Sequence, residues 1–369
     1  MRALVTGGAG LIGSHLTDLL IERGYEVTVL DNLDKQTHPN GMPAWLNQKA
    51  TFVLGDICNT RILEKALTDV DVVFHQAAFG GFTTELTKYL DVNVTGTGRL
   101  FEIIKKGQFR VKKIVIASSQ AIYGEGTYTC TIHGIQYPPQ RQIENLKRRE
   151  WEVECLHCRK DMHSVLTNED KPIHGKTIYA TSKFFEEHLA LSIGKQMGIP
   201  VVALRYAVTY GPRQSLFNPY TGVVSIFSTR ILNKLGPVIY EDGEQTRDFI
   251  YVSDIAQANL FVMEHEEISF QSFNVGTGKR TTTLEIAEKL CKAYGINVTP
   301  ILRYEFRPGD VRHFVHDSSR LQALGFTPKV NLEEGIRLAA DWICSQSNIQ
   351  ESFSNAEQLL KKHEVVLVT

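Results

Sequence analysis

The segment YATSK at residues 179–183 places a tyrosine and a lysine four positions apart. Side chains with this spacing share one face of a helix, so the Tyr179 hydroxyl and the Lys183 ammonium can lie close together. Tyrosine is a poor base at its ordinary pKa of about 10, but a neighbouring cation favours the phenolate. Ser119, at the end of KKIVIASS, can hydrogen-bond the substrate hydroxyl that such a base would deprotonate. The three residues predict proton abstraction from an alcohol. The alternative is an exposed tyrosine and lysine on a helix surface, with Ser119 as a cap.

A glycine-rich turn near the start of the chain could hold a dinucleotide. TGGAGLIGSH follows a short apolar run and opens a helical pattern, with Gly7, Gly10 and Gly13 at intervals of three. Gly7 permits a tight turn, Gly10 lets the backbone approach a pyrophosphate, and Gly13 allows helix and strand to pack closely. Asp31 ends the next apolar run, where a carboxylate accepts hydrogen bonds from a ribose and repels a 2′-phosphate. The pattern predicts NAD rather than NADP. Asp56 could reach the adenine or cap a helix.

Four further residues have the types and spacing of a metal site. They are Cys130 and His133 in TCTIHG, and Cys155 and Cys158 in ECLHC. Together they match a four-coordinate Cys₃His zinc site, which would order a segment with little periodicity of its own. His157 or His163 could replace His133 as the fourth ligand, and free packed cysteines with exposed histidines are the alternative. A thioredoxin-like redox pair needs a helix N-terminus in its own fold, and a reducing compartment disfavours a disulfide.

The elements that must position these residues alternate between apolar runs and helical patterns. Strands are expected at residues 2–6, 25–31, 50–56, 70–78, 112–119 and 200–211, with helices between them. Near-continuous apolar strands that alternate with helices indicate a parallel sheet covered on both faces. The sequence therefore predicts an α/β fold, a Rossmann-type doubly wound parallel sheet with a smaller C-terminal substrate-binding lobe.

The alternation of strand and helix patterns changes along the chain, and these changes predict where the parts begin and end. The NAD-binding Rossmann domain is expected over residues 1–211, with an inserted Cys/His segment at about 124–178. Prolines and aromatic residues become frequent from residue 212. Residues 212–345 are expected to form mainly the nucleotide-sugar-binding lobe with part of the core sheet, and residues 346–369 a C-terminal tail. A structureless loop as long as 124–178 is uncommon in a compact domain, so a further interaction should order it.

Composition excludes several classes of partner. The 369 residues carry a net charge of −1, so no basic field points to nucleic acid. No apolar segment approaches the ~18 residues that a membrane span needs, and the N-terminus lacks a signal-peptide pattern. Six cysteines without a secretory signal favour a reducing compartment. We expect a cytoplasmic protein that binds neither nucleic acid nor membrane.

The chain resembles the extended short-chain dehydrogenase/reductase family, in particular its NAD-dependent nucleotide-sugar epimerases and dehydratases. The resemblance runs from residue 1 to about residue 340. It rests on TGGAGLIGSH, LDN (30–32), GDI (55–57), HQAA (75–78), NVTGT (93–97), SSQAIYG (118–124), YATSK (179–183), LRYAVTYGPRQ (204–214), EDGEQTRDFIYVSDIA (241–256), NVGTG (274–278) and RPGD (307–310). It implies a tyrosine base at Tyr179, a serine at Ser119, and a lysine at Lys183 that also holds the nicotinamide ribose.

The matching positions also imply two binding sites. The implied cofactor residues are Gly7, Gly10, Leu11, Ile12, Gly13, Asp31, Asn32, Asp56, Ile57, Gln76, Ala77, Ala78, Asn93, Tyr179, Lys183 and Tyr206. The implied residues for a nucleotide-diphosphate sugar are Ser119, Gln120, Arg247, Arg307 and Asp310. Arg247 falls on the family's diphosphate arginine, and Arg307 and Asp310 on the pair that grips the diphosphate and ribose. A guanidinium suits phosphate because its donors are forked, although surface ion pairs are the alternative.

The resemblance also narrows the reaction. In the family, hydride passes from the sugar C4 to NAD while the tyrosine takes the hydroxyl proton, which gives a 4-keto sugar. Dehydratases carry an acidic pair after the serine or threonine, whereas this chain has Gln120 and Ala121, which transfer no protons. Return of hydride to the opposite face then predicts a 4-epimerase acting on a dTDP- or UDP-hexose. The alternatives are a UDP-glucose or UDP-GlcNAc 4-epimerase, a 4-keto-sugar reductase and, in another class, a non-catalytic NAD-sensing protein.

Two further expectations concern the hexose and the assembly. UDP-galactose-type epimerases often have R-Y-F-N in the strand after the catalytic helix, where this chain has Arg205, Tyr206, Ala207 and Val208. The lost amide fits a less polar, deoxygenated hexose. HQAA, YGEGTYTC and GDVRH are similar to the corresponding segments of bacterial dTDP-L-rhamnose 4-epimerases. The resemblance also implies a homodimer through the Tyr/Lys helix and the helix near residues 90–106.

Overall fold

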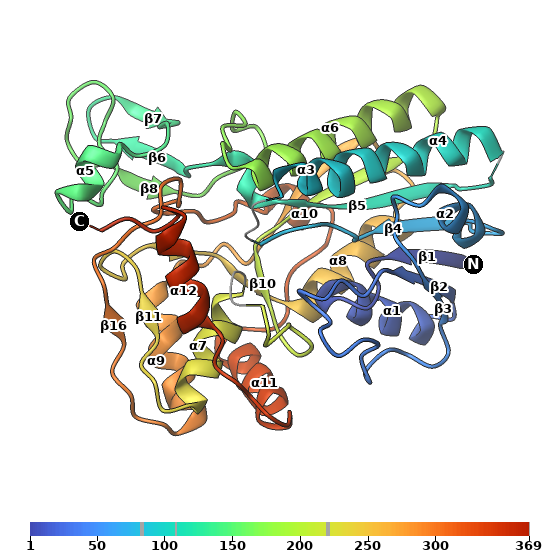
Figure 1. The fold of residues 1–369 in the computed structure, drawn as a ribbon. Helices are drawn as coiled ribbons and strands as arrows, with labels where there is room; N and C mark the ends of the chain where they lie inside the picture. The colour runs from blue at the N-terminus through green and yellow to red at the C-terminus, as the bar shows by residue number, and fades with distance from the viewer. Residues whose placement is uncertain (82–84, 108, 219–221, 369) are drawn as a thin grey trace.

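The computed structural model of the chain describes residues 1–81, 85–107, 109–218 and 222–368. Its centre is a sheet of seven parallel strands in the order β14-β9-β5-β4-β1-β2-β3 (Figure 1). The strands are β1 (Arg2–Thr6), β2 (Glu26–Asp31), β3 (Thr51–Leu54), β4 (Val72–His75), β5 (Lys113–Ser119), β9 (Val201–Tyr206) and β14 (Gln271–Val275). The strand order reverses between β1 and β4. Ligands bind at such a reversal, beyond the carboxyl ends of the strands.

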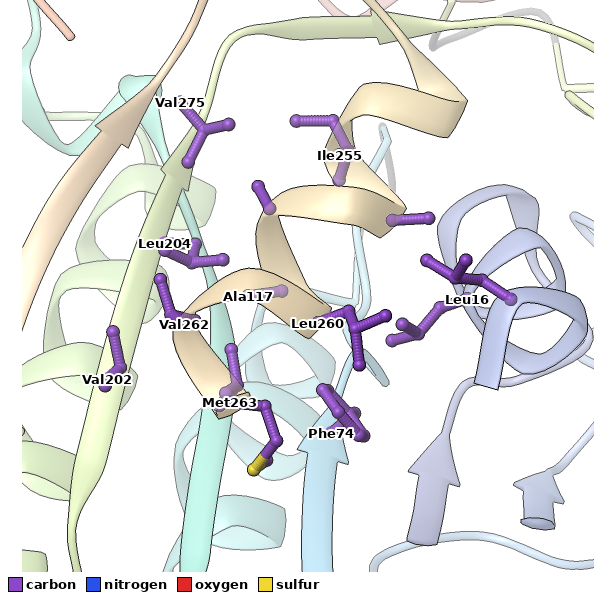
Figure 2. Close-up of a cluster of buried hydrophobic side chains, with 14 of the residues drawn as sticks. Leu16, Phe74, Ala117, Val202, Leu204, Ile255, Leu260, Val262, Met263 and Val275 are labelled. Atoms are coloured by element: carbon purple, nitrogen blue, oxygen red, sulfur yellow. The ribbon is translucent and has the colours of Figure 1, made fainter. Parts of the chain in front are cut away.

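Helices cover both faces of this sheet. α1 (Leu11–Glu22) and α8 (Val252–Glu264) cover one face, and α2 (Thr60–Ala66), α4 (Thr97–Gly107) and α6 (Ile178–Met197) cover the other. Because side chains alternate along a strand, Ala3 and Val5 of β1 join the first core and Leu4 joins the second. Figure 2 shows Leu16 of α1 and Leu260 of α8 in the first core, next to the strands. The predicted doubly wound parallel sheet is confirmed.

The apolar run predicted as one strand at 200–211 forms two strands. β9 ends at Tyr206, and β10 (Val208–Tyr210) pairs with β13 (Phe249–Tyr251) in a separate sheet. The Ala207 N–H donates to the Val275 carbonyl at 2.9 Å, and the Val208 N–H donates to the Asp248 carbonyl at 3.0 Å. The chain therefore changes pairing partner within one residue. Periodicity could not indicate this because the run is apolar on both sides of the change.

A second lobe follows β10. Its helices are α7 (Val223–Leu232), α9 (Thr283–Tyr294) and α11 (Leu332–Cys344), and its strand pairs are β11 (Val238–Ile239) with β16 (Ile301–Leu302) and β12 (Thr246–Arg247) with β15 (Thr281–Thr282). Tyr210, Phe249, Ile286 and Ile336 share one core that binds the three helices to β10 and β13. Strand β14 and the short helix α10 (Ser319–Ala323) return to the main sheet. The lobe lies beside the carboxyl ends of the strands (Figure 1).

The segment between β5 and α6 forms a small subdomain. Strands β6 (Thr127–Cys130), β7 (Gly134–Gln136) and β8 (His163–Val165) make an antiparallel sheet in the order β7-β6-β8, next to α5 (Ile143–Lys147). Tyr128, Val153 and Met162 form its apolar core together with three cysteines. Strands of three or four residues are too short to give a periodic sequence pattern, which explains why the sequence showed none here.

The C-terminal tail packs on the second lobe. Helix α12 (Phe353–Lys362) places Phe353 and Leu360 in a core with Val238 and Tyr240. Figure 1 shows that the chain end beyond α12 lies beside the inserted subdomain. In the part of the chain that the structure describes, no helix combines the length and apolar character needed to cross a bilayer.

Candidate active site

The turn between β1 and α1 requires glycine at two positions. Gly7 has φ +67°, and a Cβ on it would lie 2.7 Å from the Ala77 nitrogen. A Cβ on Gly13 would lie 2.2 Å from the Gly7 carbonyl oxygen, so α1 can cross the turn closely only without a side chain there. Gly10 precedes the first turn of α1 and meets only Gly7 at 3.4 Å. The positive end of the α1 dipole is therefore open to a phosphate.

Asp31 ends β2 beside this turn. Its Oδ2 accepts a hydrogen bond from the Ala9 N–H at 3.0 Å, and its Oδ1 accepts one from the Leu33 N–H at 2.8 Å. The two bonds fix the orientation of a carboxylate at the pocket wall. Each oxygen keeps a further lone pair that can accept a hydrogen bond from a ligand hydroxyl.

Asp56 follows β3 and also faces the pocket. It accepts hydrogen bonds from Asn32 Nδ2 and from the Cys58 N–H, both at 2.8 Å. Burial raises the pKa of Asp56, but these hydrogen bonds outweigh burial and hold the pKa below its ordinary value. The cap of α2 is Asn59, which accepts from the Ile62 N–H, so Asp56 does not serve as that cap.

One pocket joins these groups beyond the carboxyl ends of β1 to β4. The predicted cofactor residues that line it are Gly7, Gly10, Asp31, Asn32, Asp56, Ile57, Gln76, Ala77 and Ala78. Leu11 and Ile12 instead pack against the apolar cores beneath α1. The sequence did not single out Lys88 or Phe79, which also line the pocket.

Asn93 and Tyr206 lie behind this pocket and hold its lining. Asn93 is fully buried; it accepts from the Phe79 N–H at 2.7 Å and donates to Ser182 Oγ of α6 at 2.9 Å. The Tyr206 hydroxyl donates to Gln76 Oε1 at 3.1 Å. The structure therefore places both side chains in contact with residues that line the pocket, and not on the pocket surface itself.

Helix α6 brings Tyr179 to the edge of the pocket. Thr177 caps the helix by accepting from the Ala180 N–H at 3.1 Å, so Tyr179 lies in its first turn. A Cβ on Gly80 would lie 3.5 Å from Tyr179 Cε2, which places the ring against the loop that follows β4. Lys183 lies one turn further along the same helix face.

Lys183 forms a buried ion pair that the sequence analysis did not identify. Its Nζ lies 2.6 Å from Glu186 Oε2, and both side chains are almost inaccessible, at 2% and 0% exposed. Burial raises the pKa of Glu186 to about 7, although Lys183 acts in the opposite direction. The protonation state of Glu186 therefore determines how far the charge of Lys183 is compensated. Glu186 lies three residues after Lys183, a spacing that places both side chains on one helix face, and this spacing could have predicted the pair.

Ser119 is the last residue of β5, which lies between β4 and β9 in the central sheet. Its Oγ accepts from the Ala121 N–H at 3.1 Å, so the serine caps the short turn Gln120–Tyr123, as the alternative interpretation anticipated. Its hydroxyl hydrogen stays available to a ligand. Strand β5 lies between β4, which leads to the first pocket, and β9, which leads to Val208. Gln120 Oε1 is buried and accepts no hydrogen bond from the described residues.

A second pocket brings together the predicted phosphate-binding residues. Arg247, Arg307 and Asp310 all line it, and Val208 lines it too. The Arg247 guanidinium donates to the backbone carbonyls of Thr246 and Arg312, and no carboxylate among the described residues lies within ion-pair distance. Burial lowers the pKa of Arg247, and the more distant carboxylate of Asp310 offsets this only in part. The pocket therefore contains a cation that an anionic ligand can neutralise.

Arg307 also lines this pocket, but unlike Arg247 it has a carboxylate partner within hydrogen-bond distance. Its Nε donates to Asp310 Oδ2 at 2.8 Å, and its guanidinium lies 5.2 Å from the centre of the Tyr240 ring. Asp310 raises the pKa of Arg307. Phe353 and Leu360 of α12 close another side of this pocket. Spacing gave no signal for these two residues, because they lie far along the chain from Arg247.

The Cys/His residues of the inserted subdomain converge on one point. The candidate ligand atoms of Cys130, His133, Cys155 and Cys158 all lie within 4.8 Å of one another. Cys130 Sγ lies 3.7 Å from Cys158 Sγ, and His133 Nδ1 lies 3.6 Å from Cys130 Sγ and 3.4 Å from Cys155 Sγ. His157 lies beside His133 with ring centres 4.9 Å apart and does not belong to the group. His163 is on β8 and also lies outside it. The sulfur separations exclude a disulfide in this arrangement.

Comparison with known proteins places these features in a family. The model of the NAD dependent epimerase/dehydratase family matches residues 3–143 and 160–276. A dTDP-L-rhamnose 4-epimerase from Burkholderia thailandensis is 35% identical to the chain, over 94% of the chain and 95% of that protein. A putative UDP-glucose 4-epimerase from Methanocaldococcus jannaschii is 34% identical, over 92% and 97%.

Solved structures agree with these relatives. The UDP-glucose 4-epimerase of Thermotoga maritima, in complex with UDP-glucose, superposes with a TM-score of 0.76 at 32% identity; the match covers 93% of the chain and 99% of that structure. The UDP-glucose 4-epimerase of Thermus thermophilus, in complex with NAD, gives a TM-score of 0.74 at 32% identity, over 94% and 99%. The family match omits residues 144–159, which include Cys155 and Cys158.

Proposed function

The chain belongs to the NAD-dependent epimerase/dehydratase family, and from that membership we propose that it is an NAD-dependent nucleotide-sugar 4-epimerase. The observation that carries the proposal is the position of Ser119 on β5, between the strands that lead to the two pockets. Tyr179 lies against Gly80, in the loop whose residues 77–79 line the first pocket. Cofactor binding is assigned to residues 1–211, and nucleotide-sugar binding mainly to residues 212–345 with α12 of the tail. Gln120 and Ala121 after the serine favour epimerisation over dehydration, because neither can transfer a proton.

The first pocket fits NAD. Gly7 and Gly13 make a turn that a Cβ would fill, and the open N-terminus of α1 suits a pyrophosphate. The Asp31 carboxylate suits the adenosine ribose and would repel the 2′-phosphate of NADP. The Thermus thermophilus relative binds NAD, which supports the same cofactor here.

The proposed reaction assigns a separate task to each catalytic residue. NAD, when bound, supplies a hydride acceptor that takes hydride from the sugar C4 and returns it to the opposite face. Tyr179 takes the C4 hydroxyl proton during oxidation and gives it back during reduction. Ser119 donates a hydrogen bond to the C4 oxygen and holds it in line with the tyrosine. Lys183 favours the tyrosine phenolate through its charge, and Arg247 neutralises the diphosphate of the substrate.

We propose dTDP-L-rhamnose as the first substrate to test. The Burkholderia thailandensis relative carries that activity in its name, and Val208 lines the substrate pocket where an amide would suit a more hydroxylated sugar. UDP-glucose is the second candidate, favoured by the names of the Methanocaldococcus jannaschii and Thermotoga maritima relatives.

The test uses purified protein without added cofactor. We expect inversion at C4 of dTDP-L-rhamnose or UDP-glucose, followed by NMR, because bound NAD is regenerated in each cycle. A strict requirement for added NADPH would instead identify a reductase and refute the epimerase. Tyr179→Phe should lower turnover by about a thousandfold while the protein still carries NAD. Full activity of that variant would contradict the assignment of the base.

We propose that Cys130, His133, Cys155 and Cys158 bind a structural zinc ion. In a tetrahedral site with Zn–S near 2.3 Å and Zn–N near 2.0 Å, sulfur atoms lie about 3.8 Å apart and sulfur–nitrogen pairs about 3.5 Å apart. The separations of 3.7, 3.6 and 3.4 Å agree with these values. Metal analysis of protein purified without chelator should give one equivalent of zinc, and less than about a tenth would refute the site. Reduced thiolates fit the proposed cytoplasmic location.

A homodimer is also proposed. Helices α4 and α6 pack side by side, and Phe185 on α6 and Leu86 at the start of α3 (Leu86–Tyr89) are exposed, at 47% and 58%. A second copy of the chain would cover these apolar side chains. Light scattering after size exclusion should give twice the chain mass, and Phe185→Asp should give the monomer. A monomeric wild-type protein at micromolar concentration would refute the dimer.

A further inference from the structure

Residues 305–312 form a loop that carries both Arg307 and Asp310, and we name it the diphosphate loop. Two segments outside the main sheet contact it. The inserted subdomain packs on Phe306 through Leu146 and Trp151, and the end of the C-terminal tail pairs with Phe306 through Leu367. The geometry of the substrate pocket therefore depends on segments that the dinucleotide-binding fold does not itself supply.

Arg141 of the inserted subdomain reaches this loop directly. Its Nη2 donates to the Asp310 carbonyl at 2.9 Å and to Glu241 Oε1 at 2.7 Å. Its Nη1 donates to Glu241 Oε2 at 3.0 Å and to the Trp151 carbonyl, also at 3.0 Å. The Arg141 and Glu241 side chains are each 4% exposed, so the pair is shielded from solvent. One guanidinium thus joins the insertion, the diphosphate loop and a carboxylate of the substrate pocket wall.

Apolar contacts support the same arrangement. Leu146 and Trp151 of the insertion pack with Phe306 of the diphosphate loop and Leu367 of the tail. The Phe306 N–H donates to the Leu367 carbonyl at 3.0 Å, and the Leu367 N–H donates back at 2.8 Å. These contacts hold the backbone immediately before Arg307.

Glu241 has a second cationic partner. Arg312 Nη1 lies 3.1 Å from Glu241 Oε2, and Arg312 also pairs with Asp242 and Glu152. Loss of Arg141 would therefore leave Glu241 paired, while the Asp310 carbonyl would lose its donor. Glu125, whose Oε2 lies 3.9 Å from Arg141 Nε, would lose that ion pair but keep its hydrogen bonds from the Arg312 N–H. The main effect should fall on the position of the diphosphate loop, and the charge of Glu241 would stay compensated.

We propose that Arg141 is a positioning residue for the nucleotide diphosphate, a role that rests on the proposed function. It fixes the Asp310 backbone and Glu241 so that Arg307 faces Arg247 across the substrate pocket. Among the described residues, the polar partners of Arg141 include none that line the cofactor pocket, so its loss affects nucleotide-sugar binding and leaves NAD binding intact. The inserted subdomain is then a structural part of the substrate site.

The experiment measures binding of UDP and dTDP to the NAD-loaded protein by calorimetry, with KM, kcat and NAD content recorded in parallel. Arg141→Gln should weaken binding of the preferred nucleotide by about tenfold and raise KM by a similar factor. It should leave kcat within about threefold and NAD content unchanged, because the reacting residues are not displaced. Arg141→Lys should fall between wild type and Arg141→Gln, since an ammonium can pair with Glu241 but cannot reproduce the forked contacts.

Arg148→Gln is the matched control in the same insertion. Arg148 is 58% exposed and pairs only with nearby side chains of the insertion, so its loss should change neither nucleotide affinity nor KM. Nucleotide affinities of folded Arg141→Gln and Arg141→Lys within twofold of wild type would refute the positioning role. If Arg141→Gln does not fold, a threefold or larger loss of affinity in Arg141→Lys supports the role, and no loss refutes it. Failure of the wild-type protein to bind either nucleotide would instead refute the proposed function.

Discussion

The buried pair Lys183–Glu186 predicts a pH dependence of stability. Burial raises the pKa of Glu186 from its ordinary 4.5 to about 7, so the folded protein favours the protonated form. The stability from this group is fully present below pH 4.5 and is lost as the pH rises through 7. The difference between the pKa of Glu186 in the unfolded chain, 4.5, and in the folded protein, about 7, corresponds to about 3 kcal/mol of unfolding free energy. Glu186→Gln removes the titration and should remove that dependence.

The measurement is the unfolding free energy in urea at pH 5, 6, 7 and 8, at a fixed NAD concentration. The difference between wild type and Glu186→Gln should change by about 2.5 kcal/mol across this range, with the wild type losing relative stability as the pH rises. Glu102→Gln is the control, because Glu102 forms an exposed pair with Lys106 and should leave the wild-type profile unchanged. A difference that is flat with pH to within about 0.5 kcal/mol would refute the raised pKa.

The same substitution should also affect catalysis. With glutamine at position 186, the Lys183 charge loses the carboxylate that lies 2.6 Å away and acts more strongly on the proposed base. The acid limb of the kcat/KM profile should therefore move to lower pH. An unchanged acid limb would mean that the pair does not act on the proposed base.

Three further substitutions test other parts of the site. Gly13→Ala places a Cβ 2.2 Å from the Gly7 carbonyl oxygen and should lower the NAD content of the purified protein by more than about tenfold, whereas Gly98→Ala, in open space on α4, should retain NAD. Equal NAD content in both variants would contradict the close crossing of α1. Val208→Asn should raise kcat/KM for UDP-glucose relative to dTDP-L-rhamnose by about tenfold, because the amide can bind an extra hydroxyl; an unchanged ratio would remove Val208 from sugar selection. Asp248→Asn should cost about 2–4 kcal/mol of stability in urea, because the fully buried carboxylate accepts from the Thr277 and Gly278 N–H groups at 2.9 Å. A loss below about 0.5 kcal/mol would show that the carboxylate does not hold that turn.

Local patterns predicted the first pocket well, because short-range backbone geometry determines it. The spacing of Gly7, Gly10 and Gly13 constrains one turn, and Asp31 follows from the end of the next strand. The split of the run at residues 200–211 could not be predicted, because the partner of Val208 is Asp248, far along the chain. Asn93 and Tyr206 have the residue types of the family positions, but only the folded structure shows that they lie behind the pocket.

The sequence predicted the members of the Cys/His group only in part. The sequence identified Cys130, His133, Cys155 and Cys158 from two short spacings, but it left His157 and His163 as alternatives. The choice of His133 depends on how β6, β7 and the segment near Cys155 pack, which short spacings do not specify.

The sequence by itself determined the fold class, the dinucleotide turn and the shared helix face of Tyr179 and Lys183, since each follows from geometry within a few residues. Only the tertiary structure decided that Arg141 of the insertion reaches the loop at residues 305–312 and that Phe353 of the tail lines the second pocket. Such contacts join residues that are distant in the chain. They form only when all the elements pack together, and one sequence contains no periodic signal for them.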